Sequence, residues 1–160
     1  MAMSQLKSLS EALEPFVTAT EASELPILLA MLERTAAEYY RRWSEEASDP
    51  FEKAGLIACA ETEVQIAEAI ESLTSDFGRR TLDLKARFPE LAATYAAVMK
   101  GLPRADQLRT QAEGEKGGAT LLRQLAAAAQ APESALFESL ALREEANATF
   151  LWAVTREGPL

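Results

Sequence analysis

The chain has 160 residues, with 25 acidic and 16 basic side chains, no histidine and a formal net charge of −9. This charge argues against nucleic-acid binding. The absence of histidine excludes catalytic triads with a histidine base and metal sites that need histidine ligands. The lone Cys59 has no disulfide partner, and no apolar run approaches the roughly 18 residues of a membrane span. Without a signal peptide, the sequence predicts one cytoplasmic domain, 1–160.

Abundant alanine and leucine with few β-branched residues predict an all-α fold. Residues 1–22 form a lead-in, in which we expect one short helix that is capped by Ser8 or Ser10 and stopped by Pro15. The first hairpin covers 24–73, and the tight joint at its centre makes its two helices antiparallel. Its first helix takes Ser23 as N-cap, and its second takes Asp49 or Ser48.

The segment 74–107 is predicted as a crossover of two short helices. The helical pattern breaks at 88–89, which contains a proline, and again at 101–103, which contains a glycine and a proline. The second hairpin covers 108–155. Its first helix begins near residue 103 and is weakened by Gly114, Gly117 and Gly118, and its second closes before Gly158. Two hairpins joined by a helical crossover make an antiparallel four-helix bundle.

Glutamates interrupt the apolar faces of all four long helices. At about 100° per residue, Glu63, Glu115 and Glu144 fall within the apolar stripes of their helices, and Glu33 lies at the flank of its stripe. Glu63 follows Glu33 by 30 positions and Glu144 follows Glu115 by 29, so the two hairpins share a spacing. The repeat predicts carboxylates that face one another in the core of the bundle.

The first helix carries Glu33, then the small residue Ala36 and then Tyr40, and Glu63 follows in the second helix within Ala60-Glu61-Thr62-Glu63. In this pattern the chain resembles the ferritin-like superfamily, in particular its rubrerythrin-type hairpins. The resemblance implies the fold of that family, with Tyr40 beside the ligands. It also implies that the positions of its di-iron carboxylates are held by Glu33, Glu63, Glu115 and Glu144.

The chain departs from this family at the other two ligands. Where the family has histidine, three residues after a glutamate, this chain has Ile66 and Asn147, and Leu122 replaces the second tyrosine. Asn147 offers a carbonyl oxygen as a metal ligand, whereas Ile66 cannot coordinate a metal. These losses favour the hypothesis that the metal site is vestigial.

Converging carboxylates cannot all be ionised in a dry core without a cation. The sequence leaves three outcomes open: a bound metal, protonated glutamates that share hydrogen bonds, or counter-ions such as Arg123 and Arg143. It also leaves open that the glutamates are ordinary residues that fall on apolar faces by chance and reach solvent or pair with an arginine. Oxygen ligands suit manganese, magnesium or calcium, and iron is a further possibility.

Three functions remain. The first is a non-catalytic bundle that binds a partner or another subunit, which the lost histidine positions favour. The second is a manganese- or iron-dependent oxidoreductase or peroxidase-like enzyme. The third is a small-molecule binder with a core cavity near Ala36, Gly118 and Ala119. A homodimer is expected because Ile27 and Met31 lie off the main apolar stripe of the first long helix.

Overall fold

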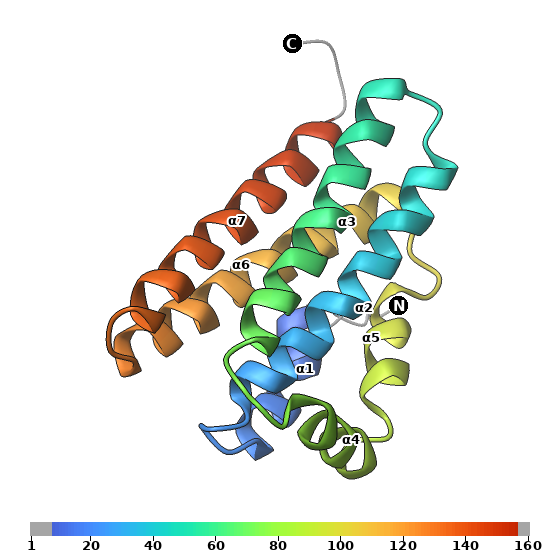
Figure 1. Cartoon of the computed structure of the whole chain (residues 1–160). Helices are drawn as coiled ribbons and strands as arrows, with labels where there is room; N and C mark the ends of the chain where they lie inside the picture. The colour runs from blue at the N-terminus through green and yellow to red at the C-terminus, as the bar shows by residue number, and fades with distance from the viewer. Residues whose placement is uncertain (1–7, 157–160) are drawn as a thin grey trace.

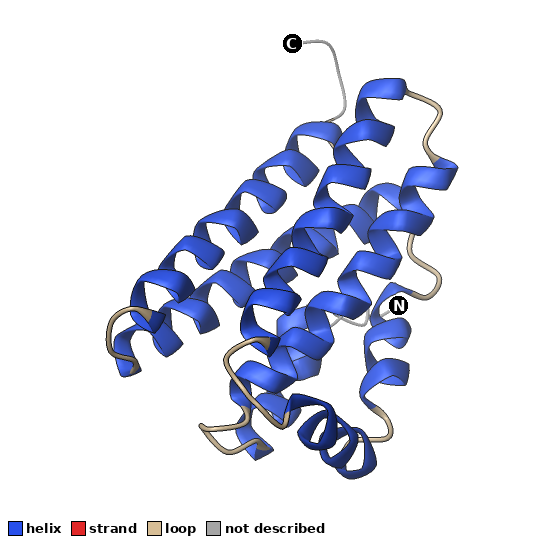
Figure 2. Cartoon of the chain, viewed as in Figure 1, coloured by secondary structure: helices blue, strands red, loops and turns tan. Residues whose placement is uncertain are grey.

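The computed structural model describes residues 8–156, and these residues form seven helices and no strand (Figures 1 and 2). The all-α prediction is therefore confirmed. The predicted breaks at 88–89 and 101–103 fall between helices. Within residues 8–156, no helix has the length and apolar character needed to cross a membrane. The helices are α1 (Leu9–Ala19), α2 (Leu25–Glu46), α3 (Pro50–Glu71), α4 (Phe77–Arg87), α5 (Leu91–Met99), α6 (Arg104–Ala128) and α7 (Glu133–Val154).

Helix α1 begins with the predicted cap. The Ser8 Oγ accepts from the Glu11 backbone N–H at 3.1 Å, and the Ser8 N–H donates to the Glu11 carboxylate at 2.9 Å. The prediction that Pro15 ends this helix is wrong, because α1 continues to Ala19. Pro15 is exposed, while Phe16 is buried in the core, so packing of the following turn holds the helix past the proline. The first seven residues of the predicted lead-in lie outside the described part of the chain.

Helices α2 and α3 form the first antiparallel hairpin (Figure 1). Asp49 caps α3 as predicted, since its carboxylate accepts from the Glu52 N–H at 2.7 Å. The prediction of Ser23 as the cap of α2 is wrong. Glu24 is the N-cap residue, and the Glu21 carbonyl accepts from the Glu24 and Leu25 N–H groups, so a backbone turn satisfies donors that a serine hydroxyl would otherwise take.

Helices α6 and α7 form the second hairpin, and α6 starts at Arg104, close to the start predicted near residue 103. The glycines of α6 do not interrupt it. A Cβ on Gly114 would lie 2.7 Å from the Leu9 side chain, and one on Gly117 would lie 2.5 Å from the Ser10 hydroxyl. These two glycines therefore let α1 pack closely on α6. The predicted stop at Gly158 lies outside the described residues.

The two residues that the sequence assigned to a dimer contact differ in burial. Ile27 is 1% exposed and belongs to the core, and Met31 is half-buried in a hollow that it shares with Phe77 and Thr81 of α4. Ile27 is therefore not free for a second copy, whereas Met31 is partly exposed. The homodimer stays a prediction, and Ile27 gives it no support.

The buried apolar residues form two clusters along the four long helices. One cluster includes Tyr40, Trp43 and Leu56, and the other includes Ile66 and Phe137. Each of the four glutamates predicted to face the core lies between two alanines of its own helix. One alanine of each pair belongs to the first cluster and the other to the second. The pairs that flank Glu33, Glu63, Glu115 and Glu144 are Ala30 and Ala36, Ala60 and Ala67, Ala112 and Ala119, and Ala141 and Ala148. A polar layer therefore separates two apolar cores.

Candidate metal centre

The four glutamates of this layer are buried, one from each long helix. Glu33 of α2 is 5% exposed, and Glu63 of α3, Glu115 of α6 and Glu144 of α7 are between 0% and 2% exposed. The alternative in which these carboxylates reach solvent is therefore wrong. Burying a carboxylate is costly unless it is paired, protonated or bound to a cation, so the surroundings of each oxygen decide what this layer can do.

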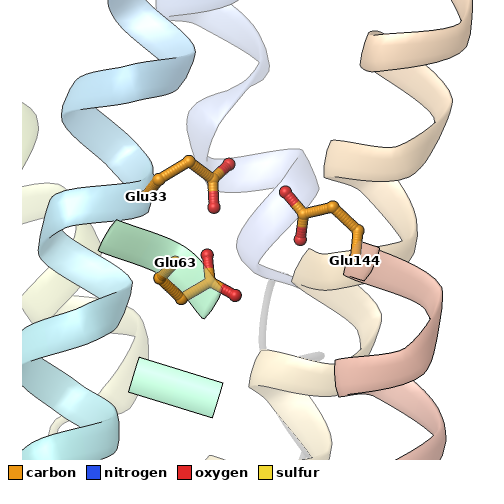
Figure 3. A group of neighbouring side chains, drawn as sticks. All are labelled: Glu33, Glu63 and Glu144. Carbon is orange, nitrogen blue, oxygen red and sulfur yellow. The ribbon is translucent and has the colours of Figure 1, made fainter. Parts of the chain in front are cut away.

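Three of the four carboxylates converge on one point. One oxygen from each of Glu33, Glu63 and Glu144 lies within 4.8 Å of the other two, and the side chains point toward one another (Figure 3). Oxygen ligands lie about 2.0–2.6 Å from magnesium or calcium, so ligands on opposite sides of one such ion are about 4–5 Å apart. The three oxygens are therefore close enough to share a single cation. Glu115 is not part of this group of three.

The glutamates also have protein hydrogen-bond donors. Asn147, predicted as a ligand, is buried, and its amide nitrogen donates to the Oε1 of Glu63. Asn147 therefore orients Glu63 in this structure. That the carbonyl oxygen of Asn147 binds a metal stays a prediction. Tyr40, predicted to lie beside the ligands, donates its hydroxyl to the Oε1 of Glu115 at 2.7 Å.

Glu115 is held by a second donor that the sequence reasoning missed. The Gln111 amide donates to the same Oε1 at 2.7 Å, and the Tyr95 hydroxyl donates to the Gln111 carbonyl at 2.5 Å. Gln111 lies four positions before Glu115 on one helix face, so its spacing offered a signal. Tyr95 lies in the crossover, and no local spacing connects it with the centre.

No basic side chain forms an ion pair with these four glutamates anywhere in residues 8–156. Arg123 pairs with Glu145 and Glu138 instead, and Arg143 donates to Gln65. The predicted arginine counter-ions are therefore wrong. A metal ion and shared protons remain as ways to balance the charge.

Burial raises the pKa of the Glu33 carboxyl from 4.5 to about 7; hydrogen bonds with Glu63 and Glu144 oppose this rise, and the charge of Glu115 adds to it. Burial, followed by the charges of neighbouring glutamates, raises the pKa values of Glu63 and Glu144 well above 4.5. The metal-free layer therefore keeps protons at pH values where surface glutamates are ionised. Burial also raises the pKa of the Cys59 thiol to about 12, as expected for a thiol that packs as a small apolar group.

Three buried oxygens of the layer have no hydrogen-bond donor: Oε2 of Glu63, Oε2 of Glu115 and Oε1 of Glu144. Leaving a buried polar atom unsatisfied costs about 1–3 kcal/mol, and more if it is charged. Two of these atoms belong to the group of three carboxylates. A cation at the centre would satisfy them, so the donor set fits a metal that prefers oxygen ligands.

Two residues that stand where the ferritin-like pattern has a histidine and a tyrosine pack in the apolar core. Ile66 and Leu122 are both fully buried in the cluster that contains Phe137. Gly118 lies against the centre, since a Cβ there would be 3.1 Å from the Oε1 of Glu144. The chain therefore supplies fewer ligands than the ferritin-like pattern, while a small residue leaves room for the Glu144 carboxylate.

A cavity of about 300 Å³ lies between α1, α2 and α6 and reaches the polar layer. Glu33, Glu115 and Glu144 line its buried end. Ala36 and Gly118 also line it, as expected for the small-molecule alternative, whereas Ala119 packs in the core. The cavity provides a route by which a small molecule can approach the carboxylates.

Comparisons of this chain with protein-family models, with curated proteins and with solved structures found no match. The residues of the polar layer are therefore the main indication of what this chain binds.

Proposed function

We propose that this chain is a ferritin-like four-helix bundle that binds a divalent cation in a carboxylate-only centre and has a binding role rather than a catalytic one. One observation carries the proposal: Glu33, Glu63 and Glu144 place oxygens within 4.8 Å of one another, and two of the three residues have buried oxygens without a donor. The two hairpins and the glutamate on each long helix support the ferritin-like architecture.

Glu33, Glu63 and Glu144 would hold the cation, and Asn147 would orient Glu63 through its amide. Manganese is the metal that we favour, because hard oxygen ligands without histidine suit it, and ferrous iron is the alternative. A bound cation would neutralise the carboxylates and supply a Lewis acid at the buried end of the cavity. The apolar clusters on either side of the layer lower the local dielectric and so strengthen the attraction between the cation and the carboxylates.

Metal binding can be tested by calorimetric titration of chelator-treated protein with Mn²⁺ and, without oxygen, with Fe²⁺. We expect saturable binding of Mn²⁺ that Glu63→Gln weakens at least tenfold, because the variant loses a ligand charge. Glu61→Gln is the matched control, since Glu61 is an exposed residue of the same helix. If wild type and Glu63→Gln bind equally weakly, the proposal fails and the centre is vestigial.

A metal-dependent oxidoreductase is the second candidate function, and the cavity favours it. Because the cavity reaches Glu33 and Glu144, a small molecule can approach a cation held there. Oxygen or peroxide consumption after addition of Fe²⁺ tests this candidate. Consumption that is catalytic and lost in Glu63→Gln would replace the non-catalytic role, and consumption no faster than that of free Fe²⁺ would exclude oxidation of this kind.

A further inference from the structure

The cavity between α1, α2 and α6 combines an apolar body with an acidic end. Leu9 and Leu13 of α1 face it from one side, and Leu29 and Leu32 of α2 from the other. Its volume of about 300 Å³ has room for about ten groups of the size of a water molecule or methylene, at roughly 30 Å³ each. A ligand with a short aliphatic chain fits this space.

The ionisable side chains of the cavity are all acids. Among the described residues that line it, the ionisable groups are tyrosine and glutamate, and none is lysine or arginine. Glu14 lies at the exposed rim with Ser10 and Gln124, and the remaining glutamates lie at the buried end. Such a lining offers hydrogen-bond acceptors to a cation and no basic partner to an anion.

Glu115 presents a fixed acceptor to this cavity. Its Oε1 is occupied by two donors, the Tyr40 hydroxyl and the Gln111 amide, each at 2.7 Å. Its Oε2 is buried and has no donor. Glu115 lies outside the group of three carboxylates that could share one cation, although its carboxyl contacts that of Glu144.

We propose that the cavity binds a primary aliphatic amine, whose ammonium group donates to the Oε2 of Glu115 and whose alkyl chain packs against the leucines of α1 and α2. An ammonium group supplies the missing donor and a balancing charge, and charge-assisted hydrogen bonds are about twice as strong as neutral ones. Each methylene buried against the leucines strengthens binding up to about fourfold. This inference goes beyond the proposed cation centre and does not depend on it.

The test is a calorimetric titration of chelator-treated protein with hexylamine at pH 7, where the amine is protonated. Hexanol and hexanoate serve as neutral and anionic ligands of equal chain length. We expect one hexylamine per chain, binding at least tenfold tighter than hexanol, with no binding of hexanoate. Equal affinity for hexylamine and hexanol would overturn the proposal, and so would measurable binding of hexanoate.

Glu115→Gln tests the acceptor itself. The glutamine carbonyl keeps an acceptor for Tyr40 and Gln111, while its amide nitrogen replaces Oε2 by a donor, so we expect hexylamine binding to fall at least tenfold. Unchanged binding would overturn the proposal. Glu113→Gln, an exposed neighbour on α6, is the control. If Glu115→Gln does not fold, the comparison of hexylamine with hexanol on wild type decides.

Mn²⁺ titrations of the same proteins separate this inference from the proposed function. Glu63→Gln is expected to lose Mn²⁺ and keep hexylamine, because Glu63 does not line the cavity. Loss of hexylamine binding in a folded Glu63→Gln protein would contradict the assignment to Glu115. If Mn²⁺ fails to bind wild type, the cation centre is refuted while the amine result stands.

Discussion

Gly118 shows how one missing side chain shapes the centre. An alanine Cβ at this position would lie 3.1 Å from the Oε1 of Glu144, so the carboxylate would have to move. Alanine also favours the helix by about 1 kcal/mol over glycine. We expect Gly118→Ala to leave the metal-free stability within about 1 kcal/mol of wild type and to weaken Mn²⁺ binding about tenfold, measured by urea denaturation and calorimetry.

Gly78→Ala is the matched control for this prediction. Gly78 is exposed in α4, and an added Cβ meets nothing within 4 Å. The control is expected to stabilise the protein by up to about 1 kcal/mol and to bind Mn²⁺ as wild type does. Equal Mn²⁺ affinity in the two alanine variants would show that Gly118 does not position Glu144.

Tyr40→Phe tests how firmly Glu115 is held. The substitution removes the donor at 2.7 Å and keeps the buried ring. We expect the free energy of unfolding to fall by about 1–2 kcal/mol. The Oε1 of Glu115 loses one of its two hydrogen bonds and keeps the one from Gln111. Urea denaturation measures this fall in the free energy of unfolding. Tyr39→Phe, at the half-buried tyrosine whose ring stacks on Tyr95, is the control, and an equal effect in both variants would contradict the prediction.

At the scale of single residues, helical periodicity identified the buried glutamates, because each one lies within or beside the apolar stripe of its helix. Even Glu33, which falls at the flank of its stripe, is buried. The network around Glu115 was less accessible. Gln111 shares its helix face, but Tyr95 comes from α5, whose position against α1 is set by tertiary packing. Local spacing carries no information about such a contact.

At the scale of elements, Gly55 of α3 marks the contact between the two hairpins. A Cβ on Gly55 would lie 2.0 Å from the ring of Phe150 in α7. Alanine gains about 1 kcal/mol of helix propensity, but displacing a packed ring costs about 1–3 kcal/mol. We expect Gly55→Ala to lower the free energy of unfolding by about 1 kcal/mol in urea denaturation.

A double-mutant cycle with Phe150→Leu separates these two effects. Once the ring is gone, Gly55→Ala is expected to stabilise the protein by up to about 1 kcal/mol through helix propensity. If Gly55→Ala has the same effect in both backgrounds, the ring does not limit the approach of α3 to α7.

Helix boundaries were predictable where a local signal acts alone. Ser8 and Asp49 cap their helices because a side-chain oxygen reaches a backbone N–H within one turn. The predicted boundaries were wrong at Pro15, where packing continues the helix, and at Ser23, where a backbone turn replaces the side-chain cap. Sequence alone also did not show that Gly114 and Gly117 of α6 admit α1, because that contact is tertiary.

The whole molecule combines two apolar cores with a carboxylate layer that weakens the metal-free fold. The buried carboxylic acids of Glu33, Glu63 and Glu144 hold their protons more tightly than they do in the unfolded chain, since the pKa of each is raised. The folded state therefore binds more protons than the unfolded state above about pH 4.5. Stability contributed by these protonated groups is fully present below that pH and is lost as the pH rises.

For Glu33, whose pKa rises from 4.5 to about 7, the loss amounts to about 3 kcal/mol once the pH has passed 7. We expect the free energy of unfolding of metal-free protein to fall by at least this order between pH 5 and pH 8. Glu63 and Glu144 act in the same direction, because their pKa values are also raised. Urea denaturation at a series of pH values in the presence of chelator measures this decline.

Glu33→Gln removes one titrating group and is expected to flatten the profile, because a neutral amide has no proton to lose. Saturating Mn²⁺ should oppose the decline in wild type, since a cation binds the deprotonated carboxylates and its stabilisation grows as the pH rises. Metal-free wild type that becomes more stable from pH 5 to pH 8 would contradict the raised pKa values. A Mn²⁺ effect that is independent of pH would mean that the ion binds away from this layer.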